Sequence, residues 1–394
     1  MAIRRPKSNK NPPILSHEFV IQNHADIVSC VAMVFVVGLM FQATNPVASL
    51  FITMQHNVTA NVSETTEQPR PEASSVTYMP GRRDMFTVFF YTLICIVVHA
   101  VIQEYILDKV NRRMHLSKVK HSKFNESGQL LVFYAVSAAW GTDIIIRENY
   151  VTNISSLWEG YPHILLPFII KLYFVIQISY WLHTLPELYF QKIKKEEMAG
   201  RVTYATLYMI FIAAAYMLNF TRVALCLMVL HYVVEFLFHT SRLLYFADKT
   251  HIANIGFMCW NFLFVIVRLG SITLAVLTFW YGLDKVSQSK GSFKEGNFNT
   301  YIIRINCLVA VCLLQAWMMW NFITFHLRRL RERTAAGAAV SSFSFSKKSS
   351  TPKKKDKKNK VKRDEDSTSG DNAEVEGPSE NGNVRQRSVK SKKH

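Results

Sequence analysis

The chain has 394 residues, of which 49% are hydrophobic and 19% charged, and its formal net charge is +18. A soluble domain carries about 25% charged residues, so this composition argues against an ordinary soluble protein. It also excludes a collagen-like chain, a disulfide scaffold and a wholly disordered protein.

Eight apolar runs follow one another along the chain. Most are close to the roughly 20 residues that a membrane-spanning helix needs, and a helix satisfies its own backbone groups within a bilayer. The sequence therefore predicts an all-α polytopic membrane protein with about eight transmembrane helices. Pro46 predicts that the first span ends or bends nearby. The runs cover residues 27–52, 85–107, 130–146, 164–185, 202–220, 223–246, 255–283 and 300–327.

The distribution of Lys and Arg predicts the orientation of these spans. With the N-terminus inside, 35 basic residues lie on the inner side and 8 on the outer side, and without the C-terminal tail the numbers are 16 and 8. Cytosolic loops are enriched in Lys and Arg. Both termini are therefore predicted to be cytosolic.

Composition divides the chain into four parts. These are a cytosolic N-terminus (1–26), two transmembrane helices with a lumenal loop at 47–84 (27–117), a larger transmembrane domain (118–326) and a tail (327–394). The tail holds 19 basic and 9 acidic residues and no segment that could bury a core, so we expect it to be disordered. Its charge is consistent with attraction to anionic lipid or ribosomal RNA, or with a merely solubilising role.

Short motifs add predictions about modification and retention. Asn57 and Asn61 each begin an Asn-X-Ser/Thr sequon in the lumenal loop, and we expect glycosylation there. Lys390 and Lys392, five and three residues from the end, resemble a dilysine retrieval signal of the endoplasmic reticulum. All six Cys lie within spans, so neither a disulfide framework nor a zinc site is predicted.

Several ionisable residues lie within the predicted spans, where a charge is costly and marks a candidate functional site. Glu235 and Arg268 are each about a dozen residues from their span ends, so they could pair near the midplane. Asp143 and Lys171 are both near the lumenal side and could pair likewise. Three interpretations stay open: ties between helices, a polar cavity for a ligand, or misplaced span boundaries.

Histidines add a second pattern. His231, Glu235 and His239 are spaced i, i+4, i+8, so they share one helix face, and His183 lies near the cytosolic end of the fourth span. The stripe could be a metal site, an acid–base group or a hydrogen-bonded packing face. It is not an HExxH motif, and no nucleotide-binding loop is present. We predict a packing or cavity face, with no metal, cofactor or catalytic residue.

Scattered segments of the first 333 residues resemble the translocating chain-associated membrane proteins. The resemblance implies a multi-pass glycoprotein of the endoplasmic reticulum. Its implied partners are the protein-conducting channel, the ribosome–channel complex and nascent secretory and membrane polypeptides. The segments are LSHEF (15–19), QNHADIVSC (22–30), IQEY (102–105), KHSKFNESGQ (120–129), YWLH (180–183), PELYFQK (186–192) and LHYVVEF (230–236).

The region 118–326 also resembles the TLC domain that ceramide synthases share. Those enzymes use adjacent histidines and paired aspartates within the membrane. Here His183 stands alone where a pair would be expected, and the segment around His231 lacks the paired aspartates. This departure argues against acyltransferase chemistry, although a cavity open to membrane lipids is still compatible with it.

Three functions follow as hypotheses. The first is a non-enzymatic translocation accessory that contacts signal sequences and transmembrane segments and assists their translocation or insertion. The alternative is a TLC-type membrane enzyme acting on lipids, with His183 and His231 as acid–base residues. A transporter is the third, although no internal repeat is visible. Crosslinking to arrested nascent chains is expected only for the first, and lipid turnover only for the second.

Overall fold

The computed structural model describes residues 16–58, 76–191, 193, 195–286 and 296–347. Contacts divide the chain into two units, with the boundary after Leu313 inside the last helix, and the contacts described below belong to the first unit. The helices are α1 (His17–Gln22), α2 (His24–Gly38), α3 (Asn45–Ile52), α4 (Asp84–Val101), α5 (Asp108–Met114), α6 (Lys118–Arg147), α7 (Phe168–Phe190), α8 (Lys195–Met217), α9 (Thr221–Phe246), α10 (Thr250–Ala275), α11 (Leu283–Lys285) and α12 (Tyr301–Lys347).

Shorter helical segments of other types connect some of these helices. Residues Ile102–Leu107 (η1) and Val276–Gly282 (η3) are π-helical, and Ile154–Leu157 (η2) is a 3-10 turn. Because η1 and η3 continue α4 and α10, each makes a longer apolar helix. Seven helices in the described part of the chain are long and apolar enough to cross a membrane. The all-α polytopic class is thereby confirmed.

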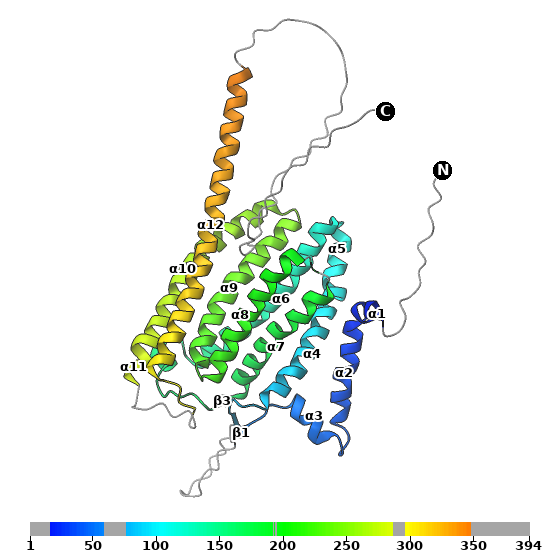
Figure 1. Cartoon of the computed structure of the whole chain (residues 1–394), viewed down its shortest axis with the longest axis vertical. Coiled ribbons are helices and arrows are strands. Elements are labelled where there is room, and N and C mark those ends of the chain that lie inside the picture. The colour runs from blue at the N-terminus through cyan, green and yellow to red at the C-terminus, as the bar shows by residue number, and fades with distance from the viewer. Residues whose placement is uncertain (1–15, 59–75, 192, 194, 287–295, 348–394) are drawn as a thin grey trace, which may run out of the picture. The chain divides into compact units, whose positions relative to one another are not determined.

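The first predicted span, 27–52, is not one continuous helix. It forms α2, of 15 residues, and α3, of 8 residues, which pack on α4 (Figure 1). The Thr44 hydroxyl donates to the Gly38 carbonyl at 2.7 Å, and the Asn45 amide donates to the Leu39 carbonyl at 2.8 Å. These side chains cap the end of α2, and Pro46 lies in the first turn of α3, where its missing N–H costs nothing. The bend predicted at Pro46 is therefore present.

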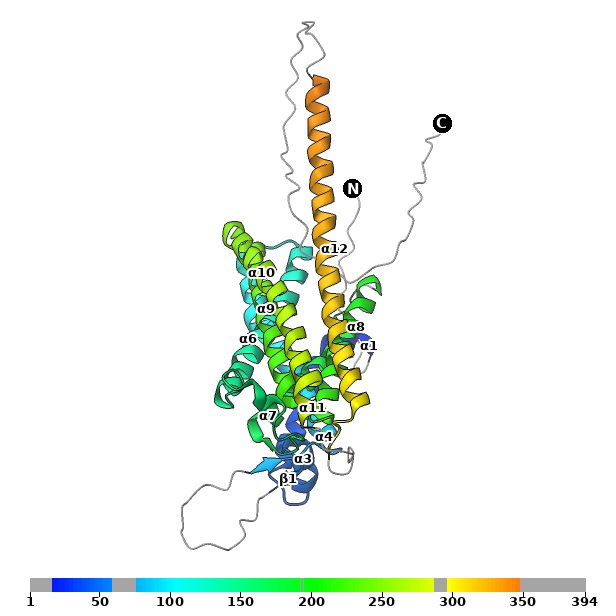
Figure 2. The same cartoon turned by 90° about the vertical axis from the view of Figure 1, so that its left-hand side faces the viewer.

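Three two-residue strands lie at one end of the helices, next to α3 (Figures 1 and 2). β1 (Asn57–Val58), β2 (Thr77–Tyr78) and β3 (Leu166–Pro167) form an antiparallel sheet in the order β1-β2-β3. Since β3 leads directly into α7, the sheet joins the loop between α3 and α4 to a helix far along the chain. We call this end of the helices the sheet end, and the opposite end the far end.

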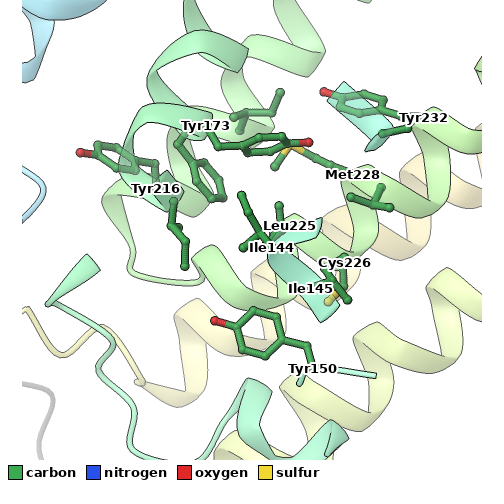
Figure 3. Close-up of a cluster of buried hydrophobic side chains, with 14 of the residues drawn as sticks. Ile144, Ile145, Tyr150, Tyr173, Tyr216, Leu225, Cys226, Met228 and Tyr232 are labelled. Atoms are coloured by element: carbon green, nitrogen blue, oxygen red, sulfur yellow. The ribbon is translucent and has the colours of Figure 1, made fainter. Parts of the chain in front are cut away.

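The main core lies between α6, α7, α8 and α9 and is rich in tyrosine. Tyr173, Tyr216 and Tyr232 point into it beside aliphatic side chains such as Leu225 (Figure 3). Gly141 allows α6 and α9 to approach closely, because a Cβ there would lie 2.4 Å from a methyl carbon of Val229. Tyrosines that are buried this deeply need partners for their hydroxyl groups, and these partners belong to the polar clusters described next.

Candidate functional site

Three clusters of buried polar side chains join the helices. The sheet-end latch consists of Asp84, Lys171 and Tyr216 with the backbone that they bind. The α9 network joins α8, α9 and α10 through the side chains of Tyr204, Tyr208, His231, Glu235 and Arg268. The histidine cluster joins α2, α4 and α7 through the side chains of His24, His99, His183, Glu187 and Gln191.

The sheet-end latch is built around the ammonium group of Lys171, whose side chain is fully buried. Its Nζ lies 2.7 Å from Asp84 Oδ1 and donates to the carbonyls of Gln55, at 2.7 Å, and Met79, at 2.8 Å. An ammonium group has three N–H donors, so all three have partners here. The two carbonyls belong to the chain on either side of the loop between β1 and β2.

Asp84 completes the latch at the start of α4. Its Oδ2 accepts from the Gly81 amide at 2.9 Å and from the Tyr216 hydroxyl of α8 at 2.8 Å. A buried ion pair is tolerated when further hydrogen bonds satisfy both groups, and that condition holds here. The latch therefore ties α4, α7, α8 and the sheet together.

The predicted pairing of Asp143 with Lys171 is wrong. Asp143 instead pairs with Arg147 one turn later on α6, at 2.8 Å, and both side chains are at least half exposed. The sequence placed Asp143 and Lys171 at similar depths but gave no information on which way each helix is turned. Lys171 faces α4, and its partner Asp84 was assigned to the end of a loop.

In the α9 network, His231 is held at both ring nitrogens. Arg268 Nη2 donates to His231 Nδ1 at 2.8 Å, and the hydroxyl of Tyr208 contacts His231 Nε2. Because a guanidinium only donates, Nδ1 carries the lone pair and the proton lies on Nε2. This assignment makes His231 a neutral imidazole that donates to Tyr208. Tyr204 extends the chain by donating to the Tyr208 hydroxyl at 3.3 Å.

The three residues of the predicted His/Glu/His stripe contact different partners. Glu235 Oε1 lies 3.8 Å from His231 Nδ1, so Glu235 and Arg268 meet at this imidazole, consistent with the predicted proximity. His239, in contrast, stacks on Tyr134 of α6, with ring centroids 5.6 Å apart. The same Tyr134 ring also contacts His231 edge-on, with ring centroids 6.3 Å apart, so Tyr134 links the two histidines of the stripe.

The histidine cluster surrounds His183 near the far end. His183 Nδ1 faces the Tyr180 carbonyl, so Nε2 is free to accept, and His99 Nδ1 lies 3.4 Å away. Glu187 lies between the imidazoles of His99 and His24. Its Oε1 is 3.5 Å from His99 Nε2, and its Oε2 is 3.6 Å from His24 Nε2. This arrangement joins the N-terminal helix α2 to α7.

The contacts within the clusters join neighbouring helices. Both ring nitrogens of His231 have partners, Tyr208 and Arg268. Among the described residues, no group of three or more His, Cys, Asp or Glu is arranged to hold a metal ion. The chemistry that is visible consists of hydrogen bonds and ion pairs between helices.

The predicted modification sites are only partly covered by the structure. Asn57 is exposed on β1, the edge strand of the sheet, which leaves its side chain accessible. Asn61, Lys390 and Lys392 lie outside the described residues, as does most of the basic tail. Glycosylation at Asn57 stays a prediction.

Sequence reasoning missed the residues that complete these clusters. Asp84 was assigned to a loop, although an acidic residue directly before an apolar run is a candidate helix start. Glu187 lies four residues after His183, a helical spacing that could have found it. His99 and Tyr208 lie within apolar runs, and the sequence offers no signal for their partners.

Comparison with known proteins agrees with this architecture. A family model described as the TLC domain matches residues 123–324. Translocating chain-associated membrane protein 2 of Homo sapiens is 48% identical over 332 residues, which cover 84% of this chain and 86% of the relative. More distant relatives are the Sphingosine N-acyltransferase-like protein ALT7 of Alternaria alternata and Ceramide synthase 4 of Bos taurus. They are 22% and 26% identical and cover 52% and 50% of this chain.

The high identity over most of both chains establishes the family, and the seven long apolar helices fit multi-pass insertion. The chain belongs to the translocating chain-associated membrane protein family, and it is a translocation-associated, multi-pass protein of the endoplasmic reticulum membrane with a TLC domain.

Proposed function

We propose that the protein is a non-enzymatic accessory of the translocation machinery that contacts signal sequences and transmembrane segments of nascent chains and assists their translocation or insertion. The observation that carries this proposal is the 48% identity to human translocating chain-associated membrane protein 2 over 84% of the chain. The α9 network supports it, because His231 is held between Tyr208 and Arg268 and is not free for acid–base catalysis. The partners would be the channel with its ribosome and the nascent chain.

The short helix α2 offers a place for this contact. Its 15 residues span about 22 Å at 1.5 Å per residue, whereas the hydrocarbon core of a bilayer is about 30 Å thick. One face of α2 packs through Ala32 against Phe90 and Leu93 of α4. Val34 lies on another face and is 70% exposed. A short helix of this kind favours local thinning of the bilayer, which would lower the cost of inserting a weakly apolar segment.

Site-specific photocrosslinking tests this proposal. A photoreactive residue replaces Val34 in membranes that contain a ribosome-arrested nascent chain with a weak signal sequence. The matched control carries the same residue at Ile266 of α10, which is apolar and 48% exposed but belongs to a different helix. We expect adducts with the nascent chain at position 34 that disappear on release with puromycin. Equal labelling at both positions, or none at either, would contradict the proposed contact.

A second candidate is an enzyme that acylates the amino group of a sphingoid base. Its support is the TLC-domain match and one contact, the approach of His99 Nδ1 to His183 Nε2 at 3.4 Å. This contact brings two imidazoles together where the sequence has a single histidine. The relatives with such printed activities match only about half of this chain, at 22–26% identity.

The variant His183→Ala separates the two candidates. An enzyme would lose its turnover of radiolabelled sphingosine and acyl-CoA in proteoliposomes. A translocation accessory would keep its crosslinks to nascent chains at position 34. Turnover in the wild-type protein that His183→Ala abolishes would therefore favour the enzyme and contradict a purely non-enzymatic function.

A further inference from the structure

A cationic side chain at the far end of α9 has an incomplete set of partners. Arg242 is only 9% exposed, and its Nε has no hydrogen-bond partner among the described residues. Its guanidinium lies 5.8 Å from the ring centroid of Phe246, which supplies a cation–π contact but no acceptor. A buried donor without an acceptor is destabilising, and more so when it is charged.

The neighbouring carboxylates are already engaged by another cation. Glu126 of α6 and Arg201 of α8 are the charged groups whose fields act on Arg242. Arg201 Nη2 donates to Glu126 Oε2 at 3.0 Å and to Glu197 Oε2 at 3.3 Å. Glu126 therefore attracts Arg242, but the Nε of Arg242 has no acceptor among the described residues.

His239 provides a second orphan group beside Arg242. It is 5% exposed, and its Nδ1 also has no hydrogen-bond partner among the described residues. Residues i and i+3 of a helix share a face, so His239 and Arg242 lie on the same side of α9. The ring of His239 is held by stacking on Tyr134, which fixes its orientation.

The depth of Arg242 indicates what kind of anion could reach it. The 26 residues of α9 are about 39 Å long, and Arg242 lies about 13 Å from the helix midpoint at 1.5 Å per residue. The hydrocarbon core extends about 15 Å from the bilayer midplane. Arg242 therefore lies close to the boundary between acyl chains and headgroups, where phospholipids carry their phosphate. Guanidinium groups bind phosphate through paired hydrogen bonds.

We propose that Arg242 and His239 form a binding site for a phosphate group, supplied by a phospholipid headgroup of the adjacent leaflet or by a soluble phosphate ester. The phosphate oxygens would accept from Arg242 Nε and from the imidazole of His239. This site is separate from the three clusters above. It does not depend on the proposed role in translocation, because a phosphate ligand is compatible with an accessory and with an enzyme.

Native mass spectrometry of the full-length protein tests the site. The protein is released from nanodiscs of phosphatidylcholine and phosphatidylinositol, and bound phospholipid is counted per chain. A separate arm adds inorganic phosphate to protein in lipid-free detergent and measures the shift in melting temperature. We expect about one retained phospholipid per wild-type chain, or a melting temperature that rises with phosphate; the first result identifies a lipid headgroup and the second a soluble ester.

Two variants sharpen this test. Arg242→Gln should lower retention or the phosphate shift at least tenfold, whereas Arg201→Gln, at a partly exposed residue with two carboxylate partners, should keep both within about twofold. Equal ligand binding in Arg242→Gln and wild type would overturn the proposal. A wild-type protein that retains no phospholipid and shows no phosphate shift would overturn it as well, even if Arg242→Gln fails to fold.

Discussion

Two ion pairs near the sheet end have nearly the same distance between their charged atoms but different surroundings. Lys171 Nζ lies 2.7 Å from Asp84, and Arg147 Nε lies 2.8 Å from Asp143. The first pair has side chains that are 0% and 6% exposed, and the second has side chains that are 75% and 50% exposed. The distance therefore does not distinguish the two pairs, and their burial decides how much each contributes to the free energy of unfolding.

The difference lies in what remains if one partner is removed. Around Lys171, two backbone carbonyls and the Asp84 carboxylate depend on a single ammonium group. Around Arg147, water can replace a lost partner at little cost. Breaking a buried pair costs several kcal/mol, whereas an exposed pair contributes about 0–1 kcal/mol.

The largest effect is expected for Lys171→Met. This change leaves the Asp84 carboxylate buried without its cation and removes the donor to the Gln55 and Met79 carbonyls. We expect a loss of about 3–5 kcal/mol in the free energy of unfolding. Denaturant unfolding in detergent micelles measures it, and a shortened half-life of the protein in cells provides a second readout.

The double variant Asp84→Asn with Lys171→Met serves as the control for that interpretation. It removes both charges and keeps an amide that can contact Gly81 and Tyr216. It should be more stable than Lys171→Met alone, because no uncompensated charge stays buried. If the single variant unfolds within about 0.5 kcal/mol of wild type, the latch is not a buried tie.

His163 is a buried titratable group whose hydrogen-bond partner is a backbone carbonyl, unlike the two ion pairs compared above. It lies between η2 and β3, is 7% exposed, and its Nε2 is 2.9 Å from the Glu159 carbonyl. The pKa of His163 is lowered from 6.5 to about 4, chiefly by burial; the bond to the Glu159 carbonyl opposes this shift, and nearby Arg222 adds to it. The unfolded chain then binds a proton below about pH 6.5 that the folded protein does not bind.

Stability from His163 is therefore present above pH 6.5 and is lost as the pH falls toward 4. Between pH 7 and pH 5 the expected loss is about 2 kcal/mol. Unfolding measured at both pH values for wild type and His163→Gln isolates this contribution, because the variant cannot titrate there. The same pH dependence in both proteins would show that His163 is not the group responsible.

Tyr208→Phe tests a smaller contribution, from a neutral hydrogen bond in the α9 network. The phenylalanine ring keeps the stacking on Trp181, whose ring centroid is 4.7 Å away, but removes the partner of His231 Nε2. We expect a loss of about 1–2 kcal/mol, because a buried N–H then lacks an acceptor. The control Tyr204→Phe removes the 3.3 Å bond to Tyr208 and a hydrogen bond with Tyr134, but it leaves His231 Nε2 its partner and should cost less. Equal losses would show that His231 does not depend on Tyr208.

The fold could be predicted from the sequence because the bilayer restricts the choices. Apolar runs of about 20 residues have one stable backbone solution in lipid, the helix, and seven of the eight predicted runs form long helices. The exception, α2 and α3, depends on side chains such as Thr44 and Asn45 that bond to carbonyls six residues earlier. Hydropathy does not record such local hydrogen bonds, so only the bend at Pro46 was predictable.

The sites were less predictable, for a geometric reason. A sequence gives the depth of a residue along its helix but not the direction in which that helix face points. Glu235 and Arg268, which were expected to pair near the midplane, both lie against the imidazole of His231, whose Nδ1 is 3.8 Å from Glu235 Oε1 and 2.8 Å from Arg268 Nη2. Lys171 was assigned the wrong partner, because Asp84 comes from a helix start more than 80 residues away.

The smallest effect completes the comparison of the two ion pairs. Asp143→Asn removes the charge that faces Arg147, while both side chains stay in contact with solvent. We expect the free energy of unfolding to change by less than about 0.5 kcal/mol, and less still at high salt, because exposed i, i+4 pairs contribute little. The same unfolding assay at 50 mM and 500 mM salt measures it. A loss comparable to that of Lys171→Met would mean that Asp143 is not solvent-exposed in the folded protein, and it would remove the contrast between the two pairs.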